Sequence, residues 1–363
     1  MKRIVRILVL LGFIAGGAFG YKLYLDDQIH SISFVTNEGN EINDIQVTYK
    51  DNIPELEIPV REGYFFAGWY TDSSKSELFN INVMPDEDIT LFADWGSEDI
   101  IYTLFQGEYI VSAGTQMPVN VIIPKLYNGI SVTKIAYQGF AFQQALASIY
   151  IPNTITEMGE GAFSNSSSLA TVIFEEGSQV PSIPNNAFLM NYSLREIEIP
   201  ASVVSIGTQA FYGSSLTSII FEENSNLESI GSSAFFQLGG LNNIEFPKSL
   251  REIGYFAFAM CNTLETITFE ENSQLESIGE AAFGGVSITS ITFPTHLVTI
   301  GPSAFISTKL QVVSIPISVE IIGDNAFLGQ YLTAIYAEAA AKPDGWSGNW
   351  NSTGVYVEWG SEE

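Results

Sequence analysis

The sequence predicts a mainly β protein, in which a solenoid of about ten stacked coils forms a parallel sheet and follows a small β module and an N-terminal membrane segment. Three observations carry this prediction. The dipeptide Ala-Phe recurs many times between residues 141 and 327. Short apolar runs lie between its copies, and residues 31–95 alternate apolar and polar side chains. A repeat of about 20 to 50 residues is typical of solenoids, and alternation at period two is typical of strands.

The composition supports packed β structure and excludes a nucleic-acid partner. Hydrophobic residues make up 46% of the chain and aromatic residues 13%, which is enough for a large core. The 41 acidic residues outnumber the 14 basic ones, for a net charge of -27. Nucleic-acid affinity depends on basic side chains that neutralise phosphates, so we expect no nucleic-acid partner. The single cysteine, Cys261, permits neither an intrachain disulfide nor a multi-cysteine metal cluster.

The N-terminus predicts export. Lys2, Arg3 and Arg6 precede an apolar run over residues 7–21, and the small residues around Ala18 offer a cleavage site. Residues 1–25 are therefore interpreted either as a cleaved signal peptide or as an uncleaved membrane anchor, and both alternatives stay open. Because basic residues precede the run and an acidic chain follows it, the positive-inside rule places the rest of the protein outside the cell. The expected location is the cell surface, or the extracellular medium after cleavage.

Residues 31–96 predict a small β module, joined to the N-terminal segment by a linker over residues 26–30. Apolar runs at residues 32–35, 45–49 and 89–92 are separated by glycines and prolines, which indicates short strands connected by turns. Four large aromatic residues are expected to fill the core, because a module of this size otherwise buries too little surface. They are Tyr64, Phe66, Trp69 and Trp95.

Two motifs in this module carry a resemblance to a known family. Residues 63–70 read G-Y-F-F-A-G-W-Y, and residues 90–95 read T-L-F-A-D-W. Together they resemble the Listeria-Bacteroides repeat, also called the internalin B-repeat type, over essentially the whole module. The resemblance implies a β-grasp-like fold in a bacterial surface protein, where the module acts as a spacer or binds a partner.

The repeats begin after this module. Steps of 21 to 25 residues separate the Ala-Phe copies, which fits the period of about 20 to 29 residues of leucine-rich repeats. Runs of the type L-x-x-I-x-I between the copies predict one strand per coil in a continuous parallel sheet. An Ile-Gly pair precedes most copies, and its glycine predicts a tight corner. The phenylalanines of the copies are Phe142, Phe163, Phe188, Phe211, Phe235, Phe258, Phe283, Phe305 and Phe327.

Two kinds of coil alternate, one ending in Ile-Pro or Phe-Pro and the other in Phe-Glu-Glu. The full pattern L-x-x-I-x-I-P-x-x-V-x-x-I-G-x-x-A-F resembles the BspA-like leucine-rich repeat family over residues 135–337. Residues 97–134 resemble that family's N-terminal cap and opening coil, and residues 338–363 its C-terminal cap. The resemblance implies a protein displayed at the cell surface that binds macromolecules.

The outward face of the sheet is the candidate ligand-binding site. One residue per strand, just before the last apolar position, is expected to point to solvent, so these residues form a column along the solenoid. A solvated face without a ligand is an equally open interpretation. No cluster of Trp, Tyr and Arg marks an interaction hot spot in the sequence. The column consists of Tyr150, Ile173, Glu198, Ile220, Glu245, Thr268, Thr292, Ser314 and Tyr336.

No residue pattern predicts an enzyme, a cofactor or a metal site. His30 lies in the linker, His296 follows a strand, and neither has a partner in sequence. Cys261 takes a position where the other coils carry small residues, so it is interpreted as an interior residue of a corner. The recurring Glu pairs provide too few ligands for calcium and are interpreted as solvated charges that prevent association.

The sequence therefore predicts a bacterial cell-surface or secreted protein for binding or adhesion. The expected partner is a macromolecule, either a host or matrix protein or a glycan, and the N-terminal segment is expected to contact the membrane. The alternative is a structural spacer of the cell envelope without a discrete ligand.

Overall fold

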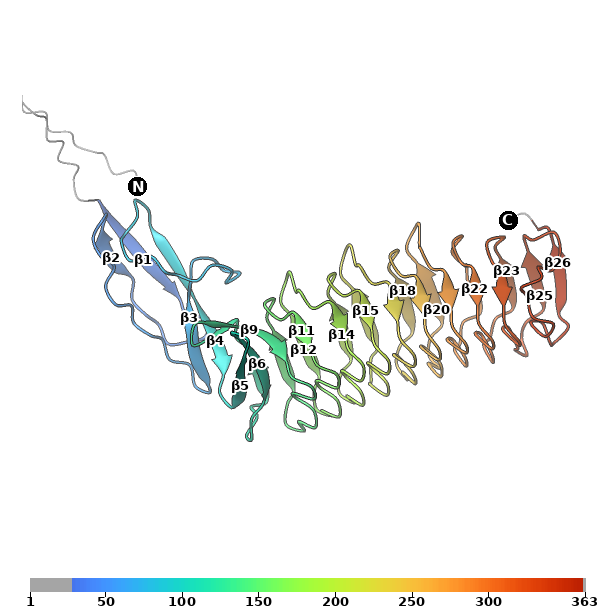
Figure 1. The fold of residues 1–363 in the computed structure, drawn as a ribbon, viewed down its shortest axis with the longest axis horizontal. Helices are drawn as coiled ribbons and strands as arrows, with labels where there is room; N and C mark the ends of the chain where they lie inside the picture. The colour runs from blue at the N-terminus through green and yellow to red at the C-terminus, as the bar shows by residue number, and fades with distance from the viewer. Residues whose placement is uncertain (1–27, 362–363) are drawn as a thin grey trace, which may run out of the picture.

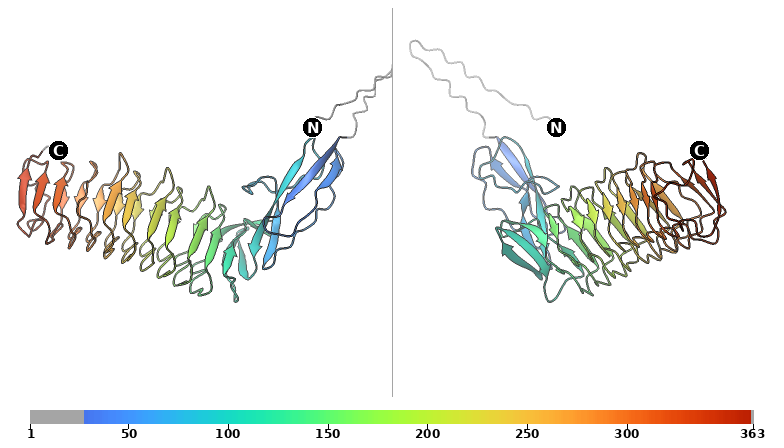
Figure 2. Two further views of the ribbon diagram at one scale, coloured as in Figure 1. Left: turned by 180° about the vertical axis from the view of Figure 1, so that it is seen from behind. Right: turned by 45° about the vertical axis from the view of Figure 1, so that its right-hand side comes forward.

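The structure is a computed structural model that describes residues 28–361. These residues fold into a small N-terminal module followed by a long stack of coils, and the two parts meet at an angle (Figures 1 and 2). The expected membrane segment, residues 1–25, lies outside the described residues. Between residues 28 and 361, the chain contains no helix that is long and apolar enough to cross a membrane.

The module is a four-stranded mixed sheet with the strand order β2-β1-β4-β3. The central strands β1 and β4 are parallel, and each pairs with an antiparallel outer strand. This arrangement confirms the β-grasp-like fold. Trp69 and Trp95 lie in the core, where Phe66 packs against both rings. His30 lies within the first strand, so the expectation that it belongs to a linker is wrong. The strands are β1 (Ile29–Val35), β2 (Ile45–Thr48), β3 (Tyr64–Tyr70) and β4 (Ile89–Ser97).

A hairpin closes the N-terminal end of the stack. The two strands of the hairpin, β5 and β6, are antiparallel to each other. Strand β6 also pairs in parallel with β9, and in this way the hairpin joins the sheet of the stack. The strands of this opening region are β5 (Ile100–Phe105), β6 (Glu108–Ala113), β7 (Asn120–Ile122), β8 (Leu126–Tyr127) and β9 (Ile130–Ile135).

Most coils contain two strands, whereas the sequence predicted one. The L-x-x-I-x-I runs form one sheet, which we name the long-strand sheet. It begins with the short strand β7 and continues with longer strands. They are β10 (Ser148–Ile151), β12 (Thr171–Phe174), β14 (Glu196–Ile199), β16 (Ser218–Phe221), β18 (Asn243–Phe246), β20 (Thr266–Phe269), β23 (Val312–Ile315), β25 (Ala334–Ala337) and β26 (Tyr356–Trp359).

The residues before each Gly-x-x-Ala-Phe segment form a second sheet of two-residue strands, the short-strand sheet. Seven of its strands, from β13 to β24, form one continuous parallel ladder. The strands are β11 (Glu157–Met158), β13 (Ser182–Ile183), β15 (Ser205–Ile206), β17 (Ser229–Ile230), β19 (Glu252–Ile253), β21 (Ser277–Ile278), β22 (Thr299–Ile300) and β24 (Ile321–Ile322). The predicted continuous sheet therefore exists, but on the other side of the coil.

The long-strand sheet is interrupted. Its ladders are β7-β10-β12, β14-β16, β18-β20 and β23-β25-β26, and residues 290–293 form no strand. Each of the three breaks follows a coil that ends in Phe-Glu-Glu. The step across these breaks is 25, 25 and 24 residues (171 to 196, 218 to 243 and 266 to 290), against 22 or 23 within the ladders of coils from β10 onward. The extra loop residues displace the next strand, so its backbone does not complete the ladder.

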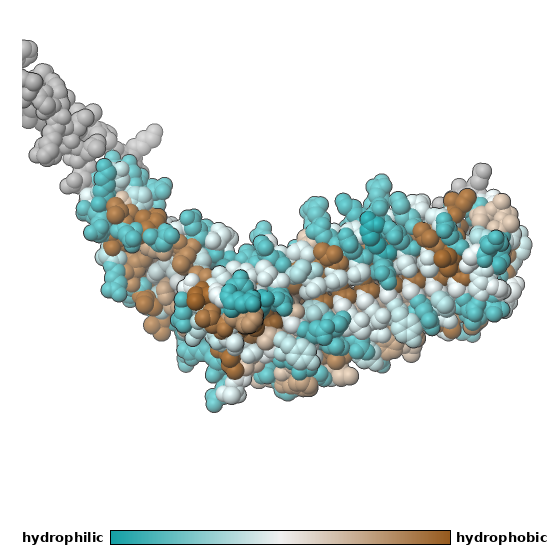
Figure 3. All heavy atoms as spheres, in the orientation of Figure 1, coloured by the Kyte–Doolittle hydropathy of each residue, from teal (hydrophilic) through white to brown (hydrophobic). Residues whose placement is uncertain are grey.

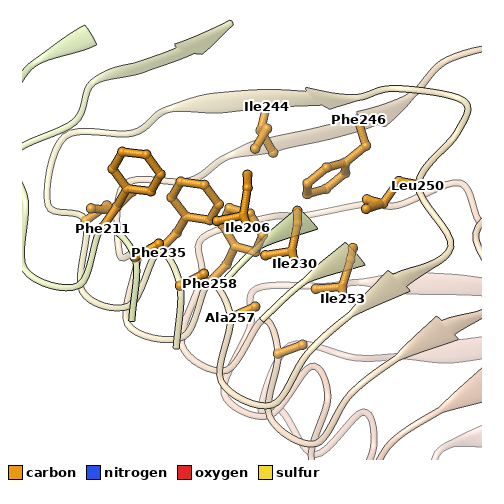
Figure 4. Close-up of a cluster of buried hydrophobic side chains, with 14 of the residues drawn as sticks. Ile206, Phe211, Ile230, Phe235, Ile244, Phe246, Leu250, Ile253, Ala257 and Phe258 are labelled. Atoms are coloured by element: carbon orange, nitrogen blue, oxygen red, sulfur yellow. The ribbon is translucent and has the colours of Figure 1, made fainter. Parts of the chain in front are cut away.

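The phenylalanine of each coil stacks on that of the next in the core (Figure 4). Ring centroids lie 5.0 to 5.6 Å apart along the whole column, at near-parallel angles. The column begins with Phe140, which is fully buried and stacks on Phe163. Phe142 is 62% exposed instead, so the Ala-Phe copy at residues 141–142 is not the first member of the series.

Backbone contacts explain why alanine and glycine recur in the coils. The N–H of Phe163 donates to the carbonyl of Ala187 in the next coil at 2.9 Å, and the later coils repeat this bond. The fully buried Ala leaves room for it. At Gly231 a Cβ atom would lie 2.7 Å from the backbone of Gly207 in the preceding coil. Glycine is required there by close stacking of two backbones, and not by the tight corner that the sequence predicted.

Tryptophans close the C-terminal end of the stack. Trp346 and Trp350 are buried, with ring centroids 4.7 Å apart, and Trp359 packs against both. The indole N–H of Trp346 donates to the carbonyl of Val319, 3.0 Å away. These rings cover the core of the last coil, as the end of a stacked array requires.

Candidate functional site

The candidate column lies on the outward face of the long-strand sheet, and its members are neighbours within each ladder. Tyr150 pairs with Ile173, Glu198 with Ile220, Glu245 with Thr268, and Ser314 with Tyr336. Thr292 lies on the stretch without a ladder partner. Ile173 and Ile220 are 48% and 42% exposed, which is unusual for β-branched apolar side chains. The visible surface of the solenoid is mostly polar, with apolar residues in a narrow line and small spots (Figure 3).

Two of the three breaks in the long-strand sheet form cavities lined by column residues. The cavity at the first break has a volume of about 300 Å³ and is lined by Ile173, Glu196, Glu198 and Glu222. A strand edge on either side leaves backbone groups without the hydrogen bonds of a complete ladder. The break therefore presents apolar, acidic and backbone polar groups together on one face.

The cavity at the third break is larger, about 610 Å³. Thr268 and Thr292 line it from its two sides, and Glu270 and His296 lie at its edge. Pockets of this size are in the range that binds small ligands or single side chains of a partner. The sequence did not predict these cavities, although the uneven spacing of the repeats was visible in it.

The N-terminal end of the column is covered rather than open. Tyr150 is half-buried, and burial followed by the adjacent Glu175 carboxylate holds its pKa above the usual value near 10. The Nζ atom of Lys125 lies 3.1 Å from Oε1 of Glu175, and both side chains are buried. Tyr150 therefore belongs to a polar cluster at the junction with the module, and the open part of the column begins at Ile173.

The same junction fixes the module on the solenoid. Lys125 Nζ donates to the carbonyl of Ser74 in the module at 2.7 Å. The module's Lys75 pairs with the buried Asp94 at 2.7 Å. The backbone N–H of Ile122 donates to the hydroxyl of Ser97. The bonds of Lys125 to Ser74 and of Ile122 to Ser97 link the two parts, and the Lys75–Asp94 pair holds the module side of this junction in place.

Aromatic rings continue this junction on its other side. Tyr102 and Tyr127 of the opening region stack with ring centroids 3.8 Å apart. Phe65 of the module packs edge-on against both of them, at 5.9 and 5.5 Å. Aromatic pairs of this geometry stabilise a contact beyond the area that they bury.

The recurring Glu pairs have a structural role that the sequence interpretation missed. The first Glu of a pair accepts a hydrogen bond from the backbone N–H of the residue that follows the proline in the preceding coil. The backbone N–H of Asn153 donates to Glu175 at 2.9 Å, that of Ala201 to Glu222 at 2.8 Å, and that of Lys248 to Glu270 at 3.0 Å. Ile317 and Glu338 repeat the bond at 2.8 Å near the C-terminal end. The first Glu therefore connects two coils and is not simply solvated.

His30 and Cys261 are the other reactive side chains that the sequence singled out. The Nε2 atom of His30 lies 3.1 Å from Oδ1 of Asp86 on the module surface. Cys261 is fully buried, its Sγ lies 3.1 Å from the carbonyl of Phe235, and burial raises its pKa to about 12. This position confirms the interpretation of an interior corner residue. Among residues 28–361, no group of three or more His, Cys, Asp or Glu side chains is arranged to hold a metal ion.

One cluster of hot-spot residue types escaped the sequence analysis. Tyr192, Arg195 and Tyr212 line a single cavity of about 600 Å³ at the edge of the stack. They come from neighbouring coils, so no local motif brings them together. A comparison of equivalent positions in adjacent coils is the only sequence signal for such a cluster.

Comparisons with known proteins agree with this architecture. The model of the BspA type leucine rich repeat region matches residues 120–236 and 206–334, and the Listeria-Bacteroides repeat domain matches residues 30–94. The crystal structure of a leucine-rich repeat protein from Bacteroides ovatus ATCC 8483 is similar, with a TM-score of 0.60 and 28% sequence identity. The similarity covers 73% of this chain and 70% of that one.

Two curated proteins of Evansella cellulosilytica match shorter stretches. A "Putative membrane protein" is 34% identical over 77 residues, which are 21% of this chain and 11% of that protein. A "Putative Gly-rich membrane protein" is 31% identical over 68 residues, 18% of this chain and 8% of that protein. This chain thus matches only about a tenth of the length of these relatives.

The fold defines a class of protein: a β solenoid of about 11 turns without helices in residues 28–361, built from leucine-rich-repeat coils and capped at both ends. The chain belongs to the BspA-type leucine-rich-repeat family. Its N-terminal module matches the Listeria-Bacteroides repeat domain.

Proposed function

We propose that this protein is displayed at the bacterial cell surface, or secreted, and binds a macromolecule through the outward face of its long-strand sheet. The ligand class is a host or matrix protein or a glycan. The observation that carries the proposal is the pair of cavities at the breaks of this sheet, because column residues line both of them. Membership of the BspA-type family and the names of the membrane-protein relatives support the surface location.

The chemistry of the first break fits a protein-type contact. Ile173 provides an exposed apolar side chain in this cavity, and Glu196 and Glu198 line the same cavity with negative charge. Ile220 adds a second exposed apolar side chain to the same face, on the strand that pairs with the other edge of β14. Binding interfaces commonly combine an apolar centre with a polar rim, and a few central residues contribute most of the binding energy. The acidic rim favours a partner with basic groups at matching positions.

The test uses the full chain against an array of extracellular-matrix proteins and glycans. A variant with Ile173→Ala and Ile220→Ala removes the exposed apolar side chains on the two sides of β14. The matched control is Ile321→Ala, because Ile321 is similarly exposed, at 47%, but lies in the short-strand sheet. We expect saturable binding by the natural sequence and the control, and a loss of about tenfold or more in affinity for the double variant.

The alternative function is a cell-envelope spacer without a discrete ligand. The junction favours it, since the hydrogen bonds and aromatic contacts between module and solenoid fix the length of the whole body. A spacer would bind none of the array at micromolar concentration and would tolerate the Ile173 and Ile220 changes. Deletion of two coils would shorten its reach instead. This combination of results would replace the binding proposal.

We propose no catalytic activity. His30 lies on the module beside Asp86, and His296 lies at the edge of the third break, far along the chain. Within residues 28–361 neither histidine forms a hydrogen bond with a Ser, Thr or Cys side chain, and the only cysteine is buried with a raised pKa. Repeat families of this kind commonly serve as scaffolds for interactions.

A further inference from the structure

A third cavity lies at the edge of the stack, on the turns that precede the long strands. Its volume is about 600 Å³, and three consecutive coils line it. One coil contributes Met190, Tyr192 and Arg195, the next contributes residues 212–215, and the third contributes Gln237 with the glycine pair at 239–240. None of these residues belongs to the candidate column.

Arg195 is the only charged residue that lines this cavity. It is exposed, and no carboxylate of residues 28–361 lies within ion-pair distance of it. An arginine without a partner is notable in a chain of net charge -27, where acidic residues outnumber basic ones almost threefold. The guanidinium group presents planar donors that match a carboxylate with two parallel hydrogen bonds.

One of the two aromatic side chains of the cavity is fixed in position. The ring of Tyr212 stacks on Phe236 of the next coil, with centroids 5.1 Å apart and planes only 6° from parallel. Tyr192 is 56% exposed, which leaves its ring available to a ligand. Rings held in this way offer flat apolar surfaces with polar hydroxyl ends.

The rest of the lining is small and polar. Ser214 lines the cavity, and its buried Oγ has no hydrogen-bond partner in the described residues. In the sister coils the equivalent groups are paired: Ser166 Oγ donates to the carbonyl of Phe140, and Cys261 Sγ contacts that of Phe235. The Ser214 hydroxyl is thus enclosed behind the wall, whereas Ser215 and Gln237 are more accessible and present polar groups to the cavity. Nothing lies within 4 Å of a Cβ built at Gly239, so the glycine leaves this wall open.

We propose that this cavity binds a glycan terminus whose pyranose ring carries one carboxylate. The ring packs on Tyr192 and Tyr212, its carboxylate pairs with Arg195, and its hydroxyls pair with Ser215 and Gln237. A polyanionic glycan is disfavoured, because the net charge of -27 repels repeated negative groups while the single Arg195 neutralises only one. A protein segment is a weaker fit, because the lining has little apolar area beyond the two rings and Met190.

The test measures binding of 3′-sialyllactose to the full chain by isothermal titration calorimetry, with lactose and sodium acetate as reference ligands. We expect saturable binding of 3′-sialyllactose with a dissociation constant between about 0.1 and 1 mM, and no measurable binding of either reference. Arg195→Ala is expected to weaken binding about tenfold or more, and Tyr192→Ala to weaken it similarly. Arg251→Ala is the matched control, because Arg251 is an exposed arginine on the same solenoid that pairs with Glu276.

Four results would overturn the proposal. They are the absence of saturable binding up to about 5 mM, well above the expected dissociation constant; equal binding of lactose; unchanged affinity in Arg195→Ala; and binding of a triglutamate peptide in place of the saccharide. This site is independent of the long-strand face. The double variant at Ile173 and Ile220 is therefore expected to bind 3′-sialyllactose normally, and a loss there would place the saccharide on the sheet face instead.

Discussion

The carboxylate of Glu222 accepts a hydrogen bond, 2.8 Å long, from the backbone N–H of Ala201 in the coil before it. Ala201 directly follows Pro200, which ends the strand β14 and leaves the next N–H without a strand partner. The side chain of one coil thus satisfies the backbone of another. The same bond recurs in three other places, so these glutamates contribute to how the coils stack.

Glu222→Ala is expected to lower the free energy of unfolding by about 1 to 2 kcal/mol, since it leaves a backbone donor without its charged acceptor. Urea denaturation followed by circular dichroism measures this change. Glu223→Ala is the matched control: its side chain is exposed, and a change within about 0.5 kcal/mol is expected. Equal effects of the two substitutions would show that the hydrogen bond has no structural importance.

Phe140→Ala is expected to destabilise the protein by about 3 to 5 kcal/mol, because it removes a fully buried ring from the end of the stacked column. Phe142→Ala, only two residues away, is expected to cost far less because Phe142 is 62% exposed. The urea concentrations at the unfolding midpoints of the two variants show which substitution costs more stability. A larger effect at Phe142 would mean that the first coil has the register that the Ala-Phe spacing suggested.

Lys125→Ala is expected to cost about 3 to 5 kcal/mol at the junction, because Glu175 is left as a buried charge without its partner. The double variant Lys125→Met with Glu175→Gln is expected to recover part of this loss, since it removes both charges. Limited proteolysis near residues 96–100 provides a second readout, as a loosened junction exposes the connection. Full protection in the single variant would show that Lys125 is not needed to hold the module on the solenoid.

The thiol of Cys261 is expected to be unreactive in the folded protein. Burial raises its pKa from 9.0 to about 12, so at pH 8 it is protonated as well as inaccessible. Ellman's reagent is expected to label it only after addition of urea. Because the folded pKa is the higher one, the contribution of the neutral thiol to stability is complete below pH 9 and is lost as the pH rises toward 12.

The free energy of unfolding, measured against pH in a Cys261 variant, separates the contribution of the thiol from that of other groups that titrate at high pH. Cys261→Ala is expected to lose less stability than the natural sequence between pH 9 and pH 11, because the substituted side chain has no thiol to ionise. Identical pH profiles of the two proteins would show that the thiol does not titrate in this range. Labelling of the folded natural protein at pH 8 would contradict the buried position directly.

The sequence predicted the architecture well because each coil repeats one local pattern. Strand positions such as Ile197 and Ile199 alternate at period two, and both are fully buried in β14. The module was also predicted, because Trp69 and Trp95 lie in motifs that one family shares. Periodicity and motif are properties of neighbouring residues, and a single sequence displays them directly.

Features that depend on contacts between coils were not predicted. The exposure of Phe142, the hydrogen bond to Glu222 and the close approach at Gly231 each involve a residue about 23 positions away. The second strand of each coil was missed because two residues are too few to show alternation. Tyr150 was placed in the open face, since nothing near it in sequence reveals that Lys125 and Glu175 lie beside it.

The breaks of the long-strand sheet recur after β12, β16 and β20, so one break follows every second coil. At about 4.8 Å per stacked strand, consecutive breaks are on the order of 10 Å apart. A linear polymer whose chemical repeat matches the roughly 20 Å between the cavities at the first and third breaks would reach the second cavity as soon as it occupies the first. Its second attachment is then intramolecular and takes place at a high effective concentration, so weak individual contacts add up to strong avidity. Loss of one two-coil unit would reduce the number of attachments without altering any of those that remain.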